Sequence, residues 1–212
     1  MRFPAKVLLL VALLLPLPGV GGEPVVLIVG DSLSAAYGID RDRGWPQLLS
    51  QQLQQAGYPH RVVNASVSGD TTSAGLARLP RALEQHAPGV VILALGANDG
   101  LRGISHAEME RNLARMIDQA RQHQARVLLV GMYLPPNYGA EYIERFHAVY
   151  TRLADEYEVA LVPFMLAGLM LDDGQTPDES MFQPDGIHPV AGAQPLILET
   201  LWPSLESLLE DL

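Results

Sequence analysis

The chain has 212 residues, of which 18% are charged and 48% hydrophobic, a composition typical of one folded globular domain. Its formal net charge is −10 at pH 7, which argues against a nucleic-acid-binding surface. Cysteine is absent, so thiol catalysis, thiolate metal sites and disulfides are excluded.

The predicted elements begin with an N-terminal leader. Arg2 and Lys6 are followed by an uninterrupted apolar stretch at 7–15 and then by small residues, the pattern of a secretory signal peptide over residues 1–22. The apolar stretch is too short to span a bilayer, which takes about 20 residues. We therefore expect one mature domain at 23–212 that is periplasmic or secreted, without a stable membrane anchor; an uncleaved anchor is the alternative. Lys6 is the only lysine, so cleavage would also exclude Schiff-base and P-loop chemistry.

From Pro24 onward, strand-like and helix-like segments alternate. Near-continuous apolar runs predict strands at 25–30, 60–66, 89–96, 126–134 and 159–164. Apolar residues recur at helical spacing within 45–53, 109–120, 143–157 and 197–208. Such strands are typical of a parallel sheet that helices cover on both faces. The sequence therefore predicts an α/β fold with a three-layer α/β/α architecture.

Two prolines complicate the predicted helices. The segment after Gly75 is less clear, because Pro80 belongs in the first turn of a helix and not in its interior. Pro203 is expected to kink the C-terminal helix, which begins at about Gln194.

Polar segments follow the predicted strands. We expect a flavodoxin-like strand order, 2-1-3-4-5, in which ligand sites lie beyond the C-terminal strand ends. Four segments stand at that edge: "GDSLS" (30–34), "SGDTT" (68–72), "GANDG" (96–100) and "DGIHP" (185–189). Each alone is ordinary turn chemistry. Together they supply a serine, an asparagine, an Asp-x-x-His pair and glycine amides, which is a strong combined indication of a site.

In this order, the four segments resemble the sequence blocks of SGNH (GDSL-type) hydrolases, and more closely the secreted bacterial thioesterase/lysophospholipase/arylesterase branch. The resemblance extends over nearly the full mature length, through "LIVGDSLSAAYGI", "RVVNASVSGDTTSAGLARLP", "LALGANDGLRG", "YLPPNYG" and "QPDGIHP". Ala97 stands where glycine is expected in many relatives. The resemblance implies the SGNH hydrolase fold and cleavage of esters, acyl thioesters and lysophospholipids, with no cofactor and no metal.

The chemistry of acyl transfer assigns roles to these residues. Ser32 is the candidate nucleophile, and His188 is the candidate base that takes its proton. Asp185 would orient the imidazole and stabilise its protonated form. The amide N–H groups of Ser32 and Gly69 and the side-chain amide of Asn98 would donate to the oxyanion of the tetrahedral intermediate.

Other polar residues have simpler interpretations. Asp31 is expected to cap a helix that follows Ser32, with a catalytic role as the alternative. Asp99 is expected to support the loop that carries Asn98. The five histidines other than His188 lie at strand or helix positions without a partner motif, and we expect them to be surface or structural residues.

The substrate is a small molecule whose acyl chain would lie in a groove at the same edge. The apolar segment "FMLAGLM" (164–170) and "YLPPNYG" (133–139) give the candidate binding residues Leu101, Tyr133, Pro135, Tyr138 and Phe164. The alternative is that 164–171 forms a short buried helix. Cleavage would remove two basic residues and no acidic ones, leaving a net charge of −12, so the chain offers no general attraction to polyanionic coenzyme A. We expect a monomer.

Two other classes of function stay open. A binuclear metallophosphoesterase would use Asp, Asn and His ligands from the same segments, but only His188 among the histidines occupies a motif. The second class is a catalytically silent α/β binding module of the envelope. An α/β-hydrolase is disfavoured because the chain has no G-x-S-x-G sequence.

Overall fold

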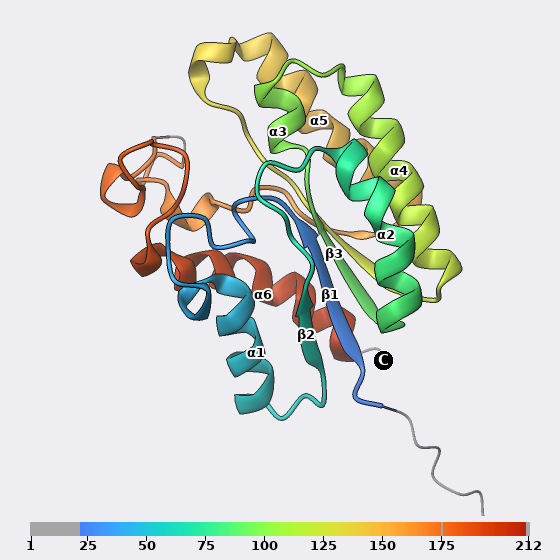
Figure 1. Ribbon diagram of the computed structural model, residues 1–212. Helices are drawn as coiled ribbons and strands as arrows, with labels where there is room; N and C mark the ends of the chain where they lie inside the picture. The colour runs from blue at the N-terminus through green and yellow to red at the C-terminus, as the bar shows by residue number, and fades with distance from the viewer. Residues whose placement is uncertain (1–21, 175, 211–212) are drawn as a thin grey trace, which may run out of the picture.

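The computed structural model describes residues 22–174 and 176–210, so that all but the last residue of the predicted signal peptide lies outside the described residues. In this part of the chain, five parallel strands form one sheet in the order β2-β1-β3-β4-β5 (Figure 1). The strands are β1 (Val25–Gly30), β2 (Arg61–Asn64), β3 (Val90–Ala94), β4 (Arg126–Val130) and β5 (Ala160–Val162). The predicted fold class and strand order are confirmed.

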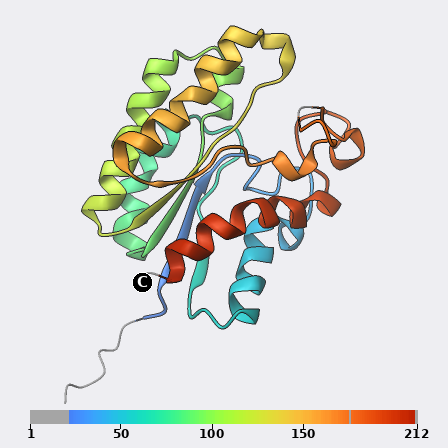
Figure 2. The same cartoon turned by 180° about the vertical axis from the view of Figure 1, so that it is seen from behind.

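Helices cover both faces of this sheet. One face carries α1 (Trp45–Gln55) and α6 (Gln194–Glu210), and the other carries α2 (Thr72–His86), α4 (His106–Gln122) and α5 (Ala140–Tyr157) (Figure 2). The central strands β1 and β3 are buried along their whole length. No helix among residues 22–174 and 176–210 is long and apolar enough to cross a membrane.

Several strands are shorter than their apolar runs predicted. The run at 126–134 pairs as a strand only to Val130, yet Met132 and Leu134 beyond it are 8% and 6% exposed. An apolar run in the sequence indicates buried side chains, and here the side chains stay buried after the backbone has left the sheet. This is why the predicted end of β4 was wrong while its location was right.

Helix α2 contradicts the expectation for Pro80. This residue lies in the interior of α2 and not in a first turn. Proline in a helix interior costs about 3 kcal/mol relative to alanine, because it lacks an N–H and crowds the preceding turn. Leu79 and Leu83 on the same helix are both fully buried, and burying one such side chain stabilises the fold by about 1.5–3 kcal/mol. Packing against the sheet therefore outweighs the local cost of Pro80.

Candidate active site

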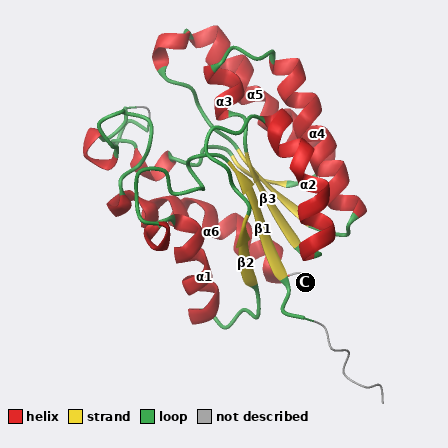
Figure 3. Cartoon of the chain, in the orientation of Figure 1, coloured by secondary structure: helices red, strands yellow, loops and turns green. Residues whose placement is uncertain are grey.

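The loops at the C-terminal end of the sheet bring together the segments predicted from the sequence (Figure 3). Strand β1 ends at Gly30, and the chain enters consecutive turns over 32–38. The first turn is closed by Ser34 and Ala35, whose N–H groups donate to the Asp31 carbonyl at 3.2 and 2.9 Å. These turns contain no helix after Ser32, so the prediction that Asp31 is a helix cap was wrong.

Ser32 and His188 are in hydrogen-bond contact although 156 positions separate them in the chain. Ser32 Oγ lies 2.8 Å from His188 Nε2. The opposite ring nitrogen, His188 Nδ1, lies 2.7 Å from Asp185 Oδ2. The three predicted catalytic side chains thus form one continuous hydrogen-bonded series.

Asp185 is held by its own turn. Its Oδ1 accepts hydrogen bonds from the N–H groups of Ile187 at 2.9 Å and His188 at 3.0 Å. These two bonds, with the contact to the His188 ring, lower the pKa of Asp185 to about 2. Gly186 between them has a φ of +67°, a conformation that glycine adopts without strain. The carboxylate is therefore ionised and oriented toward the imidazole at neutral pH.

Two neighbours of His188 were not assigned from the sequence. Gln183 Nε2 donates to the carbonyls of Tyr37 at 2.8 Å and Pro189 at 3.1 Å, and the Gln183 N–H donates to the His188 carbonyl at 2.7 Å. The ring of Tyr37, which is 52% exposed, packs against the imidazole with centroids 4.4 Å apart. These contacts join the histidine loop to the turns after β1.

The predicted oxyanion donors come from two further segments. Gly69 has a φ of +83°, in the left-handed region that a side chain would strain. Asn98 lies in a short helix, α3 (Ala97–Leu101), where the sequence had suggested a loop. Arg102 Nη2 donates to the Gly69 carbonyl at 2.9 Å and lies 3.5 Å from Asn98 Oδ1. Arg102 thereby links both segments to each other.

An arginine from α2 fixes the "SGDTT" segment. Arg78 Nε donates to Asp70 Oδ2 at 2.6 Å, and its two terminal nitrogens bond the carbonyls of Ala65 and Gly30, the latter at 3.2 Å. One guanidinium therefore connects the end of β1, the end of β2 and the residue next to Gly69. No feature of the sequence indicated this role.

Asp99 holds the segment that carries Asn98 through contacts with α2, and that segment is a short helix and not a loop. The side chain is 1% exposed and accepts from Thr72 N at 2.8 Å and Thr72 Oγ1 at 2.5 Å. It therefore joins α3, which carries Asn98, to the N-terminus of α2. Burial raises the pKa of this carboxyl.

Four of the five predicted acyl-binding residues form two pairs. Tyr133, 44% exposed, lies edge-on to Phe164 with ring centroids 5.1 Å apart and stacks on His147. Tyr138 Oη donates to the Leu101 carbonyl at 3.0 Å. Pro135 is exposed in the turn before the short 3₁₀ helix Pro136–Tyr138.

The segment after Phe164 matches the alternative interpretation in part, because only a portion of 164–171 is helical. Residues 167–169 form a short 3₁₀ helix, and Met165, Leu166 and Leu169 are buried in the core. Phe164 and Met170 are half-buried, whereas Ala167 and Leu171 are exposed, Leu171 to 49%. The apolar character of the segment thus mainly serves packing.

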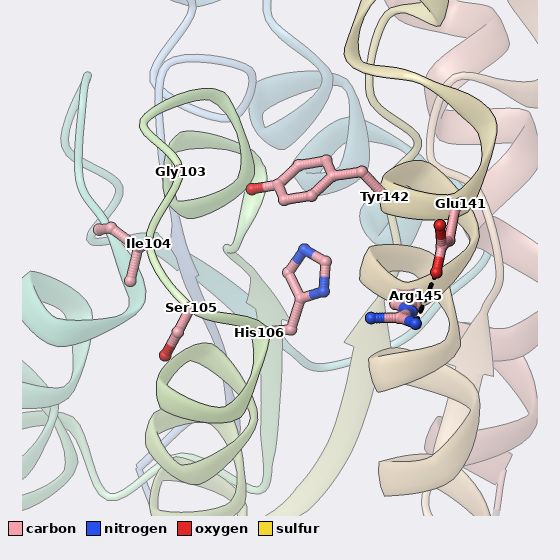
Figure 4. Close-up of a pocket in the computed structure, with 7 residues that line it drawn as sticks. All are labelled: Gly103, Ile104, Ser105, His106, Glu141, Tyr142 and Arg145. Atoms are coloured by element: carbon pink, nitrogen blue, oxygen red, sulfur yellow. Dashed lines mark hydrogen bonds and ion pairs between the residues drawn. The ribbon is translucent and has the colours of Figure 1, made fainter.

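A separate pocket of about 400 Å³ lies between the first turns of α4 and α5 (Figure 4). The ring of His106 packs against that of Tyr142 at 4.5 Å, and Tyr142 Oη donates to the Gly100 carbonyl at 3.0 Å. Glu141 and Arg145 form an ion pair at its edge. None of the predicted catalytic or oxyanion residues lines it. Nor does any group of three or more His, Asp or Glu side chains in the described ranges have the arrangement of a metal site.

Comparison with known proteins identifies the family of the chain. The model of the GDSL-like Lipase/Acylhydrolase family matches residues 28–193. The chain is 51% identical to Esterase TesA of Pseudomonas aeruginosa, covering 87% of this chain and 89% of the relative. It is 42% identical to Thioesterase 1/protease 1/lysophospholipase L1 of Escherichia coli strain K12, covering 86% and 84%. A crystal structure of TesA superposes with a TM-score of 0.81 at 50% identity, over 87% of this chain and 99% of that one. The chain therefore belongs to the GDSL-like lipase/acylhydrolase family.

Proposed function

We propose that this protein hydrolyses carboxylic esters and acyl thioesters through an acyl-enzyme intermediate on Ser32. The observation that carries the proposal is the hydrogen-bonded series from Ser32 Oγ through the His188 ring to Asp185. A serine hydroxyl is a weak nucleophile until a base removes its proton, and a neutral imidazole in contact with it can do so.

The reaction would proceed in two stages, acylation of Ser32 and hydrolysis of the acyl-enzyme. Ser32 Oγ attacks the acyl carbon as its proton moves to His188 Nε2, and the protonated imidazole is stabilised by Asp185. The bond to the leaving oxygen or sulfur then breaks, and Nε2 returns the proton to the departing alcohol or thiol. Water repeats the sequence on the acyl-enzyme and releases the carboxylic acid.

The carbonyl oxygen becomes negative in each tetrahedral intermediate and needs donors in place beforehand. We assign this role to the N–H groups of Ser32 and Gly69 and to Asn98 Nδ2. The contacts of Arg102 with Gly69 and Asn98 support the assignment, because they keep both segments at the same edge of the sheet as Ser32.

The substrate class follows from the relatives and from the exposed aromatic residues. Names of the relatives include esterase, thioesterase and lysophospholipase. We assign the acyl chain to the surface formed by Tyr133 with Phe164 and by Tyr138 with Leu101; Pro135 lies between the two pairs in the chain. We also propose that the protein is a monomer and that a signal peptide over 1–22 exports it. It would then act on esters or lysophospholipids outside the cytoplasm.

The other two classes of function lack comparable support. A metallophosphoesterase would need several metal-ligating side chains in one place, and the described residues bring none together in that way. A silent binding module would not require a serine, an imidazole and a carboxylate in hydrogen-bond contact.

The test is hydrolysis of an acyl ester, an acyl thioester and a lysophospholipid by wild type, Ser32→Ala and Ser34→Ala. We expect Ser32→Ala to lose at least about a thousandfold in kcat while it remains folded. Ser34→Ala is the matched control, because Ser34 lies in the same turns, is fully buried and its hydroxyl bonds to no described residue. It should retain the wild-type rate. Near-normal turnover by Ser32→Ala would contradict the proposed nucleophile.

A further inference from the structure

Asp31 is a buried carboxylate that the mechanism above does not use. It directly precedes Ser32 and is 3% exposed. Each of its oxygens faces one donor: Oδ1 accepts from Leu33 N at 3.0 Å, and Oδ2 accepts from Asn98 Nδ2 at 3.3 Å. The first contact lies within the turn that carries the nucleophile Ser32 (the nucleophile turn, 31–35), whereas the second connects the end of β1 to α3.

We propose that Asp31 is a positioning residue that orients the Asn98 side-chain amide so that its second N–H points to the oxyanion. This inference rests on the proposed function, in which Asn98 is an oxyanion donor. A primary amide has two N–H groups on one nitrogen. With one of them directed to Asp31 Oδ2, the amide plane is fixed and the other remains available for the substrate oxygen.

The same contact selects between the two ends of the amide. If the Asn98 amide were turned over, its Oδ1 would face a carboxylate oxygen, and two acceptors would oppose each other. In the observed orientation, Asn98 Oδ1 instead lies 3.5 Å from Arg102 Nη2. Asn98 is thus held by an acceptor on its nitrogen side and by a donor on its oxygen side.

A carboxylate suits this position better than the alternatives. Two donors, Leu33 N–H and Asn98 Nδ2–H, converge on Asp31, and a carboxylate offers two acceptor oxygens. An asparagine offers one acceptor and one donor group, so one of the two contacts would be lost. Burial raises the pKa of Asp31 to about 6, so an ionised carboxylate is destabilised at this position. The contact with Leu33 N–H does not require a charge, because an uncharged side chain with an acceptor oxygen could make it.

The experiment is a double-mutant cycle on one short-chain aryl ester, with wild type, Asp31→Asn, Asn98→Ala and the double variant. If Asp31 acts through Asn98, Asp31→Asn should lower kcat by at least about tenfold, and by no more than the roughly 10²–10³ expected for loss of one whole oxyanion donor. KM should change by less than about threefold, because the interaction strengthens only in the transition state. In the Asn98→Ala background, Asp31→Asn should change kcat by less than about threefold.

Asp99→Asn is the matched control for removing a buried carboxylate, because the Asp99 carboxylate accepts from Thr72 N and Thr72 Oγ1 and not from the Asn98 amide. Whatever its effect, it should be the same factor in the wild-type and in the Asn98→Ala background. If Asp31→Asn does not fold, as judged by its melting curve, Asp31→Ser replaces it, since a hydroxyl can still accept from Leu33.

Two results would overturn the inference: an unchanged kcat in Asp31→Asn, or an equal loss in both backgrounds, which would mean that Asp31 acts on the nucleophile turn alone. A normal rate in Asn98→Ala is a different failure, because it would remove Asn98 from the oxyanion site and contradict that part of the proposed function.

Discussion

At the scale of single residues, Asp31 should make the stability of the protein depend on pH. Burial raises its pKa from 3.8 to about 6, against the opposing effects of the Leu33 N–H, the His188 charge and Asn98; the Asp70 charge adds a small increase. The folded state therefore binds this proton more tightly than the unfolded state. The contribution of Asp31 to stability is fully present below about pH 4 and is lost as the pH rises through about 6, a loss of about 3 kcal/mol by pH 7.

We predict that Asp31→Asn lacks this pH dependence. The measurement is the free energy of unfolding in urea for both proteins at pH 4 and pH 7. From pH 4 to pH 7, the difference between variant and wild type should shift by about 2.5 kcal/mol in favour of the variant, whatever its value at pH 4. A difference that stays constant with pH would show that Asp31 titrates at the same pH in the folded and unfolded states.

The residues that could be predicted from the sequence are those with a local signature. Ser32, Asp185 and His188 stand in short motifs, and the Asp-x-x-His spacing lets one turn present both side chains. The residues that hold these motifs in place could not be predicted, because their contacts are distant in sequence. Arg78 bonds a carbonyl 48 positions away and Gln183 one 146 positions away, and an arginine or glutamine at such a separation leaves no pattern.

At the scale of elements, periodicity located the strands and helices but not all of their ends. Strand β4 is shorter than its apolar run because side chains remain buried beyond the last paired residue. Helix α2 continues through Pro80 because the burial of its leucines outweighs one lost hydrogen bond. Helix α3 was missed because Ala97–Leu101 is too short for a periodic signal, and Gly, Asn and Asp there suggest a turn.

The C-terminus of α2 provides a prediction at this scale. Its last turn is closed by Ala87, an exposed residue with φ +41° and ψ +58° whose N–H donates to the Leu83 carbonyl. A left-handed conformation costs about 1–2 kcal/mol for a residue with a Cβ. Ala87→Gly should therefore stabilise the protein by about 0.5–1 kcal/mol, after allowing for the greater flexibility of glycine in the unfolded chain.

The control for that substitution lies in the same helix. Ala77 is also exposed but has an ordinary place in the interior of α2, so Ala77→Gly should destabilise the protein by about 0.5–1 kcal/mol. Melting temperatures of both variants check the prediction. Two shifts of the same sign would show that the conformation of Ala87 is not strained.

At the scale of the whole molecule, the α/β pattern was sufficient to predict the sheet. Alternating apolar strands and amphipathic helices allow few topologies, and the order β2-β1-β3-β4-β5 places the segments after β1, β2 and β3 at one edge. The net charge of −10 is also a property of the whole chain, and it has a consequence for charged substrates. A strongly negative protein repels an acyl thioester of coenzyme A over distances comparable with the Debye length.

We therefore predict that salt accelerates hydrolysis of octanoyl-coenzyme A but not of an uncharged octanoyl thioester or aryl ester. Raising the ionic strength from about 10 mM to about 150 mM shortens the Debye length from about 30 to about 8 Å, which screens the repulsion between protein and coenzyme. The effect should appear as an increase in kcat/KM for the coenzyme A substrate, with kcat unchanged, because long-range charge acts on the encounter and not on the bond that breaks. Substrate concentrations below the micellar range keep aggregation out of the comparison.

Arg102 beside Gly69 and Asn98 is the local cation that could reverse this outcome. A fall in kcat/KM for octanoyl-coenzyme A with salt would mean that this arginine attracts the coenzyme more strongly than the whole chain repels it. Acyl thioesters of coenzyme A would then be favoured as physiological substrates.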